Sequence, residues 1–131
     1  MSEDERDDLM RRALGARKKA VAPYSKFKVG AALVTESGEF YTGANVESAS
    51  YGLTCCAERV ALFNALTDGA RRFRAIAIAA PHKDGATPCG ACRQLLAEYA
   101  PKAVLFTADS RRPRRIREFS IKELLPEAFR L

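Results

Sequence analysis

Three cysteines of this chain occur at spacings that suit a metal ion. Cys89 and Cys92 form a Cys-x-x-Cys pair, whose two thiolates can bind one zinc ion, and Cys56 lies upstream of them. The first eight residues are acidic and lack the apolar stretch of a secretory signal, so we expect a cytoplasmic location. There the cysteines should stay reduced, and metal binding or catalysis is their expected role.

The number of ligands decides whether such a site is structural or catalytic. A structural zinc ion is normally closed by four protein ligands, whereas a catalytic zinc ion keeps one position open. The candidates for a fourth ligand are Cys55 and His82. Cys55 is better explained as a small buried residue, and His82 falls in a predicted loop, where exposure is the default. We therefore expect three cysteine ligands, a water molecule in the fourth position and a catalytic site.

Two charged residues follow Cys56 directly in the chain. Glu58 is not needed as a ligand, which makes its carboxylate a candidate proton carrier, although it could also be a simple partner of the helix dipole. Three thiolates carry more negative charge than Zn²⁺ carries positive charge. Other groups must offset the excess if zinc-bound water is to ionise near neutral pH. The predicted helix N-termini at the cysteines would contribute. Arg59 could donate hydrogen bonds to the thiolates, or it could be a surface residue.

The elements that position these residues alternate between strands and helices. Strands are predicted at Phe27–Val34, Phe40–Val46, Phe73–Ala80, Ala103–Ala108 and Arg117–Ile121. Helices are predicted from the capping box Ser2–Glu5 to a point before Pro23, at Thr54–Asp68, at Gly90–Ala100 and after Ser120. The strand-helix-strand-helix-strand middle implies parallel neighbouring strands. We expect one α/β domain over residues 1–131, a three-layer α/β/α fold around a mixed five-stranded sheet.

The positive charge of the chain is concentrated in one segment. The formal net charge is +6, and five of the 22 Lys and Arg residues lie in residues 111–117. Such a run could bind phosphates, but no aromatic residues interleave the arginines as a base-stacking surface requires. We therefore expect an exposed turn between two strands. The longest apolar run, Ala75–Ala80, is too short to cross a bilayer, so no membrane association is expected.

The segments Cys56-Ala57-Glu58 and Pro88-Cys89-Gly90-Ala91-Cys92 resemble the signature of zinc-dependent nucleobase deaminases, in its three-cysteine form. The chain is most similar to the small, homotetrameric cytidine deaminases, over nearly its whole length. The segments that carry the resemblance are Ala22–Phe27, Asn45–Glu47, Ala49–Gly52, Cys56–Arg59, Pro88–Gln94 and Glu123–Pro126. Ser48 stands where the family more often has Asn, and Cys55 falls at a variable position. Neither departure affects the predicted catalytic set.

This resemblance implies the reaction and the cofactor. The reaction is the zinc-dependent hydrolytic deamination of cytidine and deoxycytidine to uridine and deoxyuridine, with release of ammonia, as in pyrimidine salvage. One Zn²⁺ per subunit would be bound by Cys56, Cys89 and Cys92. A zinc-activated water would attack C4 of the base, and Glu58 would carry protons from the water to ring N3 and to the leaving group.

The resemblance also implies a set of residues that bind the nucleoside. Phe27 resembles the aromatic residue that packs against the pyrimidine ring, although its strand pattern also fits a core position. Asn45 and Glu47 resemble the pair that binds the ribose hydroxyls, and they could instead form a turn or cap a helix. The backbone N–H of Ala57 resembles the donor to the pyrimidine carbonyl.

A homotetramer is the expected assembly. A chain of 131 residues has little surface with which to close a dry pocket, and a neighbouring subunit can cover it. Tyr51 and Phe129 resemble residues that reach the site of a neighbouring subunit.

Three other functions are compatible with parts of the pattern. A deaminase of polynucleotides would use the arginines of residues 111–117, but the deaminase core leaves no insertion for a strand-binding groove, and Glu47 would repel phosphate. We therefore expect no nucleic-acid partner. Another aminopyrimidine nucleoside, such as an antibiotic, could be the substrate, although Phe27 and Asn45–Glu47 favour cytidine. A structural zinc module without activity would need a fourth protein ligand.

Overall fold

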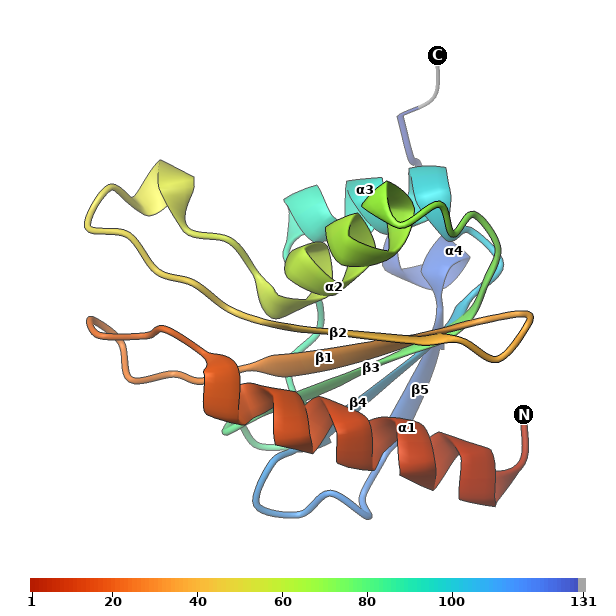
Figure 1. Cartoon of the computed structure of the whole chain (residues 1–131), viewed down its shortest axis with the longest axis horizontal. Coiled ribbons are helices and arrows are strands. Elements are labelled where there is room, and N and C mark those ends of the chain that lie inside the picture. Colours follow the sequence, from red (N-terminus) through yellow and green to blue (C-terminus); the bar gives the residue numbers. More distant parts are fainter. Residues whose placement is uncertain (130–131) are drawn as a thin grey trace.

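The computed structural model describes residues 1–129. The strands are β1 (Gly30–Thr35), β2 (Phe40–Ala44), β3 (Phe73–Ala80), β4 (Val104–Asp109) and β5 (Arg117–Ser120). The helices are α1 (Glu3–Ala16), α2 (Ala57–Thr67), α3 (Gly90–Tyr99) and α4 (Ile121–Leu124), with 3₁₀ turns at Arg17–Lys19 and Tyr51–Leu53. The strands form one mixed sheet in the order β2-β1-β3-β4-β5. Helices lie on both of its faces, so the predicted three-layer α/β/α fold is confirmed (Figure 1).

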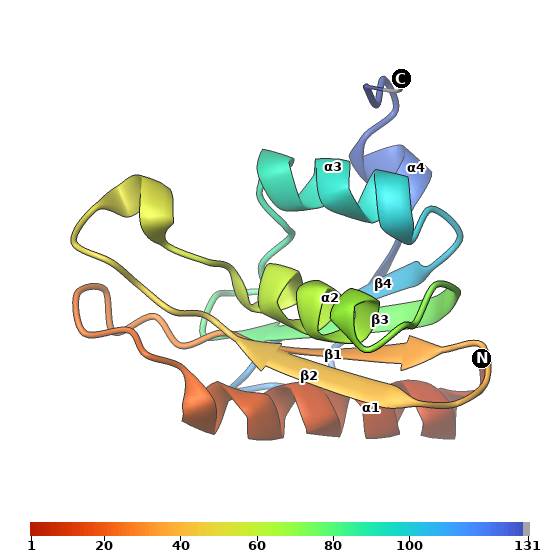
Figure 2. The same ribbon diagram turned by 45° about the horizontal axis from the view of Figure 1, so that its top comes forward.

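The two faces of the sheet differ in the size of their side chains. Helix α1 covers one face, while α2, α3 and α4 cover the other (Figure 2). Along β3, the alanines Ala75 and Ala77 belong to the core under α1, whereas Ile76 and Ile78 belong to the core under α2 and α3. This alternation follows from the two-residue period of a strand. The small side chains of β3 therefore face α1, and its larger ones face the helices of the side that carries the cysteines.

One neighbour relation in the sheet differs from the expected one. Strand β1 lies between β2 and β3 and pairs antiparallel with both. Since β4 and β5 are also antiparallel, β3 and β4 are the only parallel neighbours among the strands of residues 1–129. Burial explains the order, because every residue of β1 is buried whereas the first three residues of β2 are exposed or half-buried. The strand that is apolar on both faces takes the interior position, and the more polar strand of the hairpin takes the edge.

Two elements begin three residues later than the sequence pattern predicts. β1 starts at Gly30 and not at Phe27, because the side chain of Asn45 binds the preceding segment in place of a strand partner. Helix α2 starts at Ala57 and not at Thr54, because Cys55 exchanges two backbone hydrogen bonds with Val46, of 2.8 and 3.0 Å. Both differences come from long-range contacts that local propensity does not contain.

The segment that contains the arginine run is an exposed turn between β4 and β5, as expected. Arg111 donates two hydrogen bonds of 2.9 Å to the carboxylate of Asp109, and the guanidinium of Arg117 lies 4.9 Å from the centre of the Phe119 ring.

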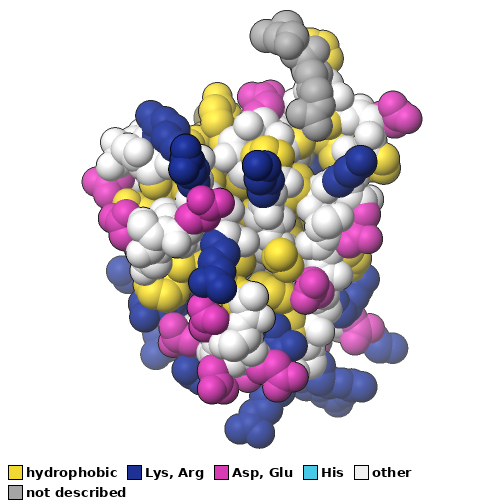
Figure 3. All heavy atoms as spheres, turned by 90° about the vertical axis from the view of Figure 1, so that its right-hand side faces the viewer, with side chains coloured by type: hydrophobic (Ala, Val, Ile, Leu, Met, Phe, Trp, Pro, Cys, Tyr) yellow, Lys and Arg dark blue, Asp and Glu magenta, His cyan; other side chains and the backbone are white. Residues whose placement is uncertain are grey.

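At the end of the molecule shown in Figure 3, Lys and Arg side chains are interspersed with Asp and Glu. Within residues 1–129, none of the helices has the length and apolarity that a membrane crossing requires.

Gly43 allows α2 to lie directly on β2. A Cβ atom at Gly43 would lie 2.4 Å from the backbone nitrogen of Ala61 and 2.5 Å from the carbonyl oxygen of Ala57. Neither backbone atom can rotate away. We therefore expect Gly43→Ala to lower the free energy of unfolding by about 1–3 kcal/mol, as overpacking does. Urea unfolding measures the change. Gly15→Ala is the control, because open space surrounds Gly15 within α1. A Gly43→Ala protein as stable as the wild type would contradict this account of the packing.

Candidate active site

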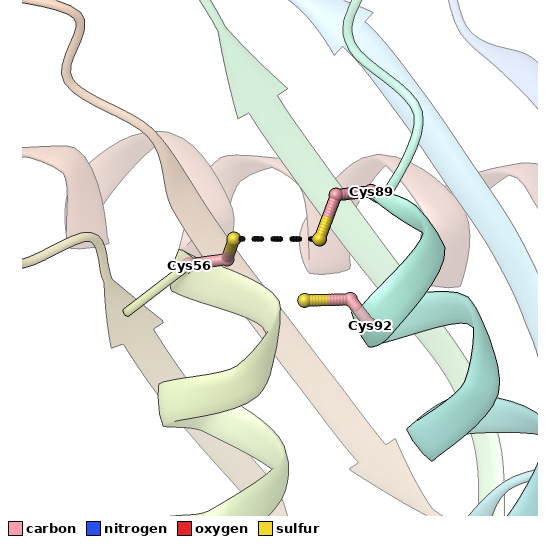
Figure 4. A group of neighbouring side chains, drawn as sticks. All are labelled: Cys56, Cys89 and Cys92. Carbon is pink, nitrogen blue, oxygen red and sulfur yellow. Dashed lines mark hydrogen bonds between the residues drawn. The ribbon is translucent and has the colours of Figure 1, made fainter. Parts of the chain in front are cut away.

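The three predicted cysteine ligands converge at the N-termini of two helices. Cys56 is the N-cap of α2, Cys89 is the N-cap of α3, and Cys92 is the third residue of α3. Their Sγ atoms all lie within 4.8 Å of one another, and those of Cys56 and Cys89 are 3.8 Å apart. Figure 4 shows the three side chains pointing toward one another from the two helices. Both helix ends direct free N–H groups and a positive dipole toward the sulfur atoms, which favours thiolates.

The geometry and the chemistry of this cluster fit a zinc ion. Tetrahedral zinc with Zn–S bonds of about 2.3 Å places two sulfur ligands about 3.8 Å apart. Hydrogen bonding from Cys92 and Cys89 and the nearby charge of Arg59 lower the pKa of Cys56 to about 6. The same contact with Cys56, together with burial, raises the pKa of Cys92. Three thiolates this close repel one another, so a cation is what allows all of them to ionise together.

Neither of the two further candidate ligands joins the cluster. Within residues 1–129, the group of side chains that could bind one metal ion consists of Cys56, Cys89 and Cys92. Cys55 pairs through its backbone with Val46, and burial raises the pKa of its thiol. The Nδ1 atom of His82 lies 2.9 Å from the carbonyl oxygen of Lys83, within its own loop. Three sulfur ligands leave room for a fourth, non-protein ligand.

Glu58 lies in the first turn of α2, two residues after Cys56, and is 6% exposed. Desolvation raises the pKa of its carboxyl to about 7, and the negative charge of Cys56 adds to this effect. A carboxyl that titrates near neutral pH can both accept and donate a proton. A cation bound at the sulfur atoms would lower this pKa, because it favours the carboxylate.

The raised pKa of Glu58 makes stability depend on pH in the metal-free protein. The folded value of about 7 lies above the ordinary value of 4.5. At low pH the carboxyl is neutral in both the folded and the unfolded protein, so its pKa shift does not change the free energy of unfolding. That free energy decreases as the pH rises from the ordinary pKa through the folded pKa. We expect metal-free Glu58→Gln to be more stable than the metal-free wild type at pH 8, by up to about 3 kcal/mol, and equal to it at pH 4. Urea unfolding at both pH values tests this, and an equal difference at both would contradict it.

Arg59 lies beside the sulfur atoms. Its Nη2 atom is 3.8 Å from the Sγ atom of Cys92, and its Nε atom is buried without a hydrogen-bond partner among the described residues. Arg59 is half-buried, with its guanidinium next to the cluster. The positive charge of the guanidinium partly offsets the negative charge of the thiolates.

The candidate substrate-binding residues lie before β1, after β2 and at the start of α2. The side chain of Asn45 accepts a hydrogen bond from the Val29 N–H at 2.9 Å and donates one to the Phe27 carbonyl at 2.8 Å. Asn45 therefore fixes the backbone on either side of Lys28. Phe27 itself is half-buried and lies outside β1, so it is not a strand core residue. Ala57, the remaining candidate, is the first residue of α2, where its N–H points out of the helix end.

Glu47 is held by Tyr24 and Ser25, which lie more than 20 positions before it in the chain. Its carboxylate accepts hydrogen bonds of 3.1 Å from the N–H groups of Tyr24 and Ser25, and a further one from the Ser25 hydroxyl. These hydrogen bonds lower the pKa of Glu47, and the bond from the Ser25 hydroxyl has the largest effect. A hollow of about 310 Å³ is lined by Tyr24, Ser25, Glu47, Ser48, Tyr51 and Thr54. Ser25 lies in Ala22–Phe27, one of the segments that carry the family resemblance. No local pattern pairs it with Glu47, which lies 22 positions away.

Tyr51 and Phe129 are exposed. Their exposed fractions are 87% and 66%, and the backbone of Phe129 is bound by the side chain of Gln94. Both side chains are therefore open to solvent in the single chain.

Comparison with known proteins agrees with this arrangement. Residues 3–108 match the family described as the cytidine and deoxycytidylate deaminase zinc-binding region, and this range contains Glu58 and the three cysteines of the cluster. The chain belongs to the cytidine deaminase family. A cytidine deaminase of Halalkalibacterium halodurans is 48% identical over 128 residues, which cover 95% of this chain and 94% of that protein.

Solved structures of the family share the fold. The crystal structure of cytidine deaminase from Burkholderia pseudomallei is 46% identical, has a TM-score of 0.90, and is matched over 98% of this chain and 100% of that one. The cytidine deaminase structure from Mycobacterium tuberculosis is 38% identical with a TM-score of 0.82, over 97% and 98% of the two chains. Cytidine deaminase activity is a hydrolysis, so the chain is a hydrolase, and the triad of Cys56, Cys89 and Cys92 belongs to its zinc-binding region.

Proposed function

We propose that residues 1–131 form one domain that deaminates cytidine and deoxycytidine to uridine and deoxyuridine, with release of ammonia. The observation that carries the proposal is the convergence of three thiol groups next to the buried carboxyl of Glu58. The thiol groups of such a site must be available to the metal, which agrees with a reducing cytoplasmic location.

The chemistry divides between the metal and Glu58. Zinc, when bound, lowers the pKa of water and so supplies a nucleophile near neutral pH. Glu58 accepts a proton from the attacking water and delivers it to ring N3. It then moves a second proton, from the new hydroxyl group on C4, to the amino group, which leaves as ammonia while the C4 carbonyl forms. Arg59 and the two helix N-termini offset the charge of the thiolates throughout.

Ribose recognition is assigned to Asn45 and Glu47, and pyrimidine recognition to Phe27 and the Ala57 N–H. Glu47 is well suited to accept from hydroxyl groups, because its low pKa keeps it ionised. We expect Asn45→Ala and Glu47→Ala to raise KM for cytidine by about tenfold or more each, since a charge-assisted hydrogen bond contributes about 1.5–3 kcal/mol. Activity on free cytosine, which lacks ribose, should change far less. Equal effects on cytidine and cytosine would remove both residues from ribose recognition.

We assign the chain to a homotetramer in which Tyr51 and Phe129 extend to neighbouring subunits. Large apolar side chains that single subunits leave exposed, among them Tyr51, Leu53 and Phe129, support an interface. Light scattering tests the assembly. A fully active monomer would contradict it.

The proposed reaction is tested by incubating the purified protein with cytidine and with deoxycytidine while the ultraviolet absorbance is followed. A decrease that a chelator abolishes supports the proposal. A parallel assay with a cytosine-containing single-stranded oligonucleotide separates nucleoside from polynucleotide substrates. Conversion of the oligonucleotide alone would overturn the proposal.

A further inference from the structure

The segment that leads into Cys89 has no regular secondary structure to hold it. Residues 81–89 connect β3 to α3, and Cys89 is exposed. As the N-cap of α3, Cys89 has an extended backbone and makes no capping hydrogen bond through its side chain. Cys92, by contrast, is buried within the helix. The position of one of the two sulfur atoms of the Cys-x-x-Cys pair therefore depends on contacts made by residues 81–89.

Thr107 binds the carbonyl oxygen of Ala86, and the side chain of Arg93 binds the two residues directly before Cys89. The Arg93 side chain starts in the second turn of α3 and extends back toward the N-terminus of the helix, as long helical side chains do. Its Nε atom donates to the carbonyl oxygen of Pro88 at 2.7 Å, and its Nη2 atom donates to the hydroxyl of Thr87 at 2.9 Å. Its Nη1 atom donates to the carbonyl oxygen of Leu124 at 3.0 Å. One planar guanidinium thus joins α3, the two residues before Cys89 and the end of α4.

We propose that Arg93 is a positioning residue that holds Cys89 in place for the metal ion. The carbonyl of Pro88 belongs to the peptide bond that precedes Cys89, and Arg93 follows Cys92 directly, so this side chain fixes the spacing between the two sulfur ligands. A site that is ordered before the metal arrives does not have to be ordered by binding. The inference rests on the proposed zinc site, because Arg93 itself touches neither substrate nor sulfur in the contacts described above.

The test compares zinc release from Arg93→Gln, Arg93→Lys and the wild type. Each zinc-loaded protein is mixed with a coloured chelator, and the release rate is measured. We expect Arg93→Gln to release zinc about 10- to 100-fold faster, the range typical for loss of a group that orients a ligand. Arg93→Lys should lie between the two, because one ammonium group cannot span the three acceptors. The visible spectrum of the cobalt-substituted proteins should differ between Arg93→Gln and the wild type.

Arg74→Gln is the matched control. Arg74 is an exposed residue whose guanidinium contacts Glu5, on the side of the sheet that α1 covers. It should leave zinc release and the cobalt spectrum unchanged. Urea unfolding of all metal-free proteins separates positioning from general stability. Faster release that merely parallels a loss of metal-free stability, or release at the wild-type rate with an unchanged spectrum, would overturn the proposal.

Thr87→Val provides a milder test if Arg93→Gln does not fold. It removes one acceptor of the guanidinium and keeps the shape of the side chain. We expect zinc release to be several-fold faster than in the wild type. Wild-type release in both Thr87→Val and Arg93→Lys would reject the role of Arg93. The absence of bound zinc from the wild-type protein is a different result, and it would reject the proposed zinc site itself.

Discussion

Glu58→Gln is expected to lower kcat for cytidine by about 10²- to 10⁴-fold, the contribution typical of a positioned general acid-base group. Glutamine has the same shape as the protonated glutamate but cannot accept a proton from water or deliver one to ring N3. Because Glu58 is buried, bulk water cannot easily take its place. The measurement is steady-state deamination of cytidine by protein of known zinc content.

The zinc content of Glu58→Gln must be compared with that of the wild type. Glu58 is not one of the three ligands, so the variant should still bind one zinc ion per chain and should unfold at a similar temperature when loaded. Near wild-type kcat in a zinc-loaded variant would show that another group carries the protons. Loss of zinc together with activity would mean that Glu58 acts on the metal site and not on the substrate.

Removal of the metal is expected to abolish activity and to destabilise the fold. Replacing Cys92 with serine removes the buried member of the triad and leaves two sulfur ligands, which should lower zinc binding below detection at micromolar metal. An ion that binds only the folded state adds about 4 kcal/mol of stability at a concentration 1,000 times its Kd. We therefore expect Cys92→Ser, or wild-type protein treated with a chelator, to melt at a clearly lower temperature than the zinc-loaded enzyme. Calorimetry with and without added zinc measures the difference.

Cys55→Ser is the control for Cys92→Ser, because it makes the same substitution at a cysteine outside the triad. Cys55 is adjacent to Cys56 in the chain, yet its hydrogen bonds to Val46 are made by its backbone, and its thiol lies outside the triad. It should keep zinc, activity and the zinc-dependent increase in melting temperature. If Cys55→Ser lost zinc as Cys92→Ser does, the assignment of the ligands would be wrong.

Much of this molecule follows from local patterns in the sequence. The capping boxes at Ser2 and Ser120 form as predicted, and β3 has the predicted bounds Phe73–Ala80. These elements depend on short-range chemistry, namely side-chain capping and an unbroken apolar run. The metal-binding pattern is equally local, since Cys89 and Cys92 are three residues apart and Glu58 follows Cys56 by two.

Other features depend on contacts between distant residues, and only the tertiary structure decides them. Insertion of β1 between β2 and β3 depends on burial of both its faces. The late start of α2 depends on Cys55 pairing with Val46.

The sequence alone thus determined the family signature, the order of helices and strands and the identity of the three thiol ligands. The tertiary structure decided that the N-termini of α2 and α3 meet, which places sulfur atoms 33 residues apart in the chain at 3.8 Å. It also decided that His82 lies outside this group and that Ser25 holds Glu47. The physical reason is that periodicity and capping are properties of neighbouring residues, whereas packing on the shared sheet fixes which distant side chains meet.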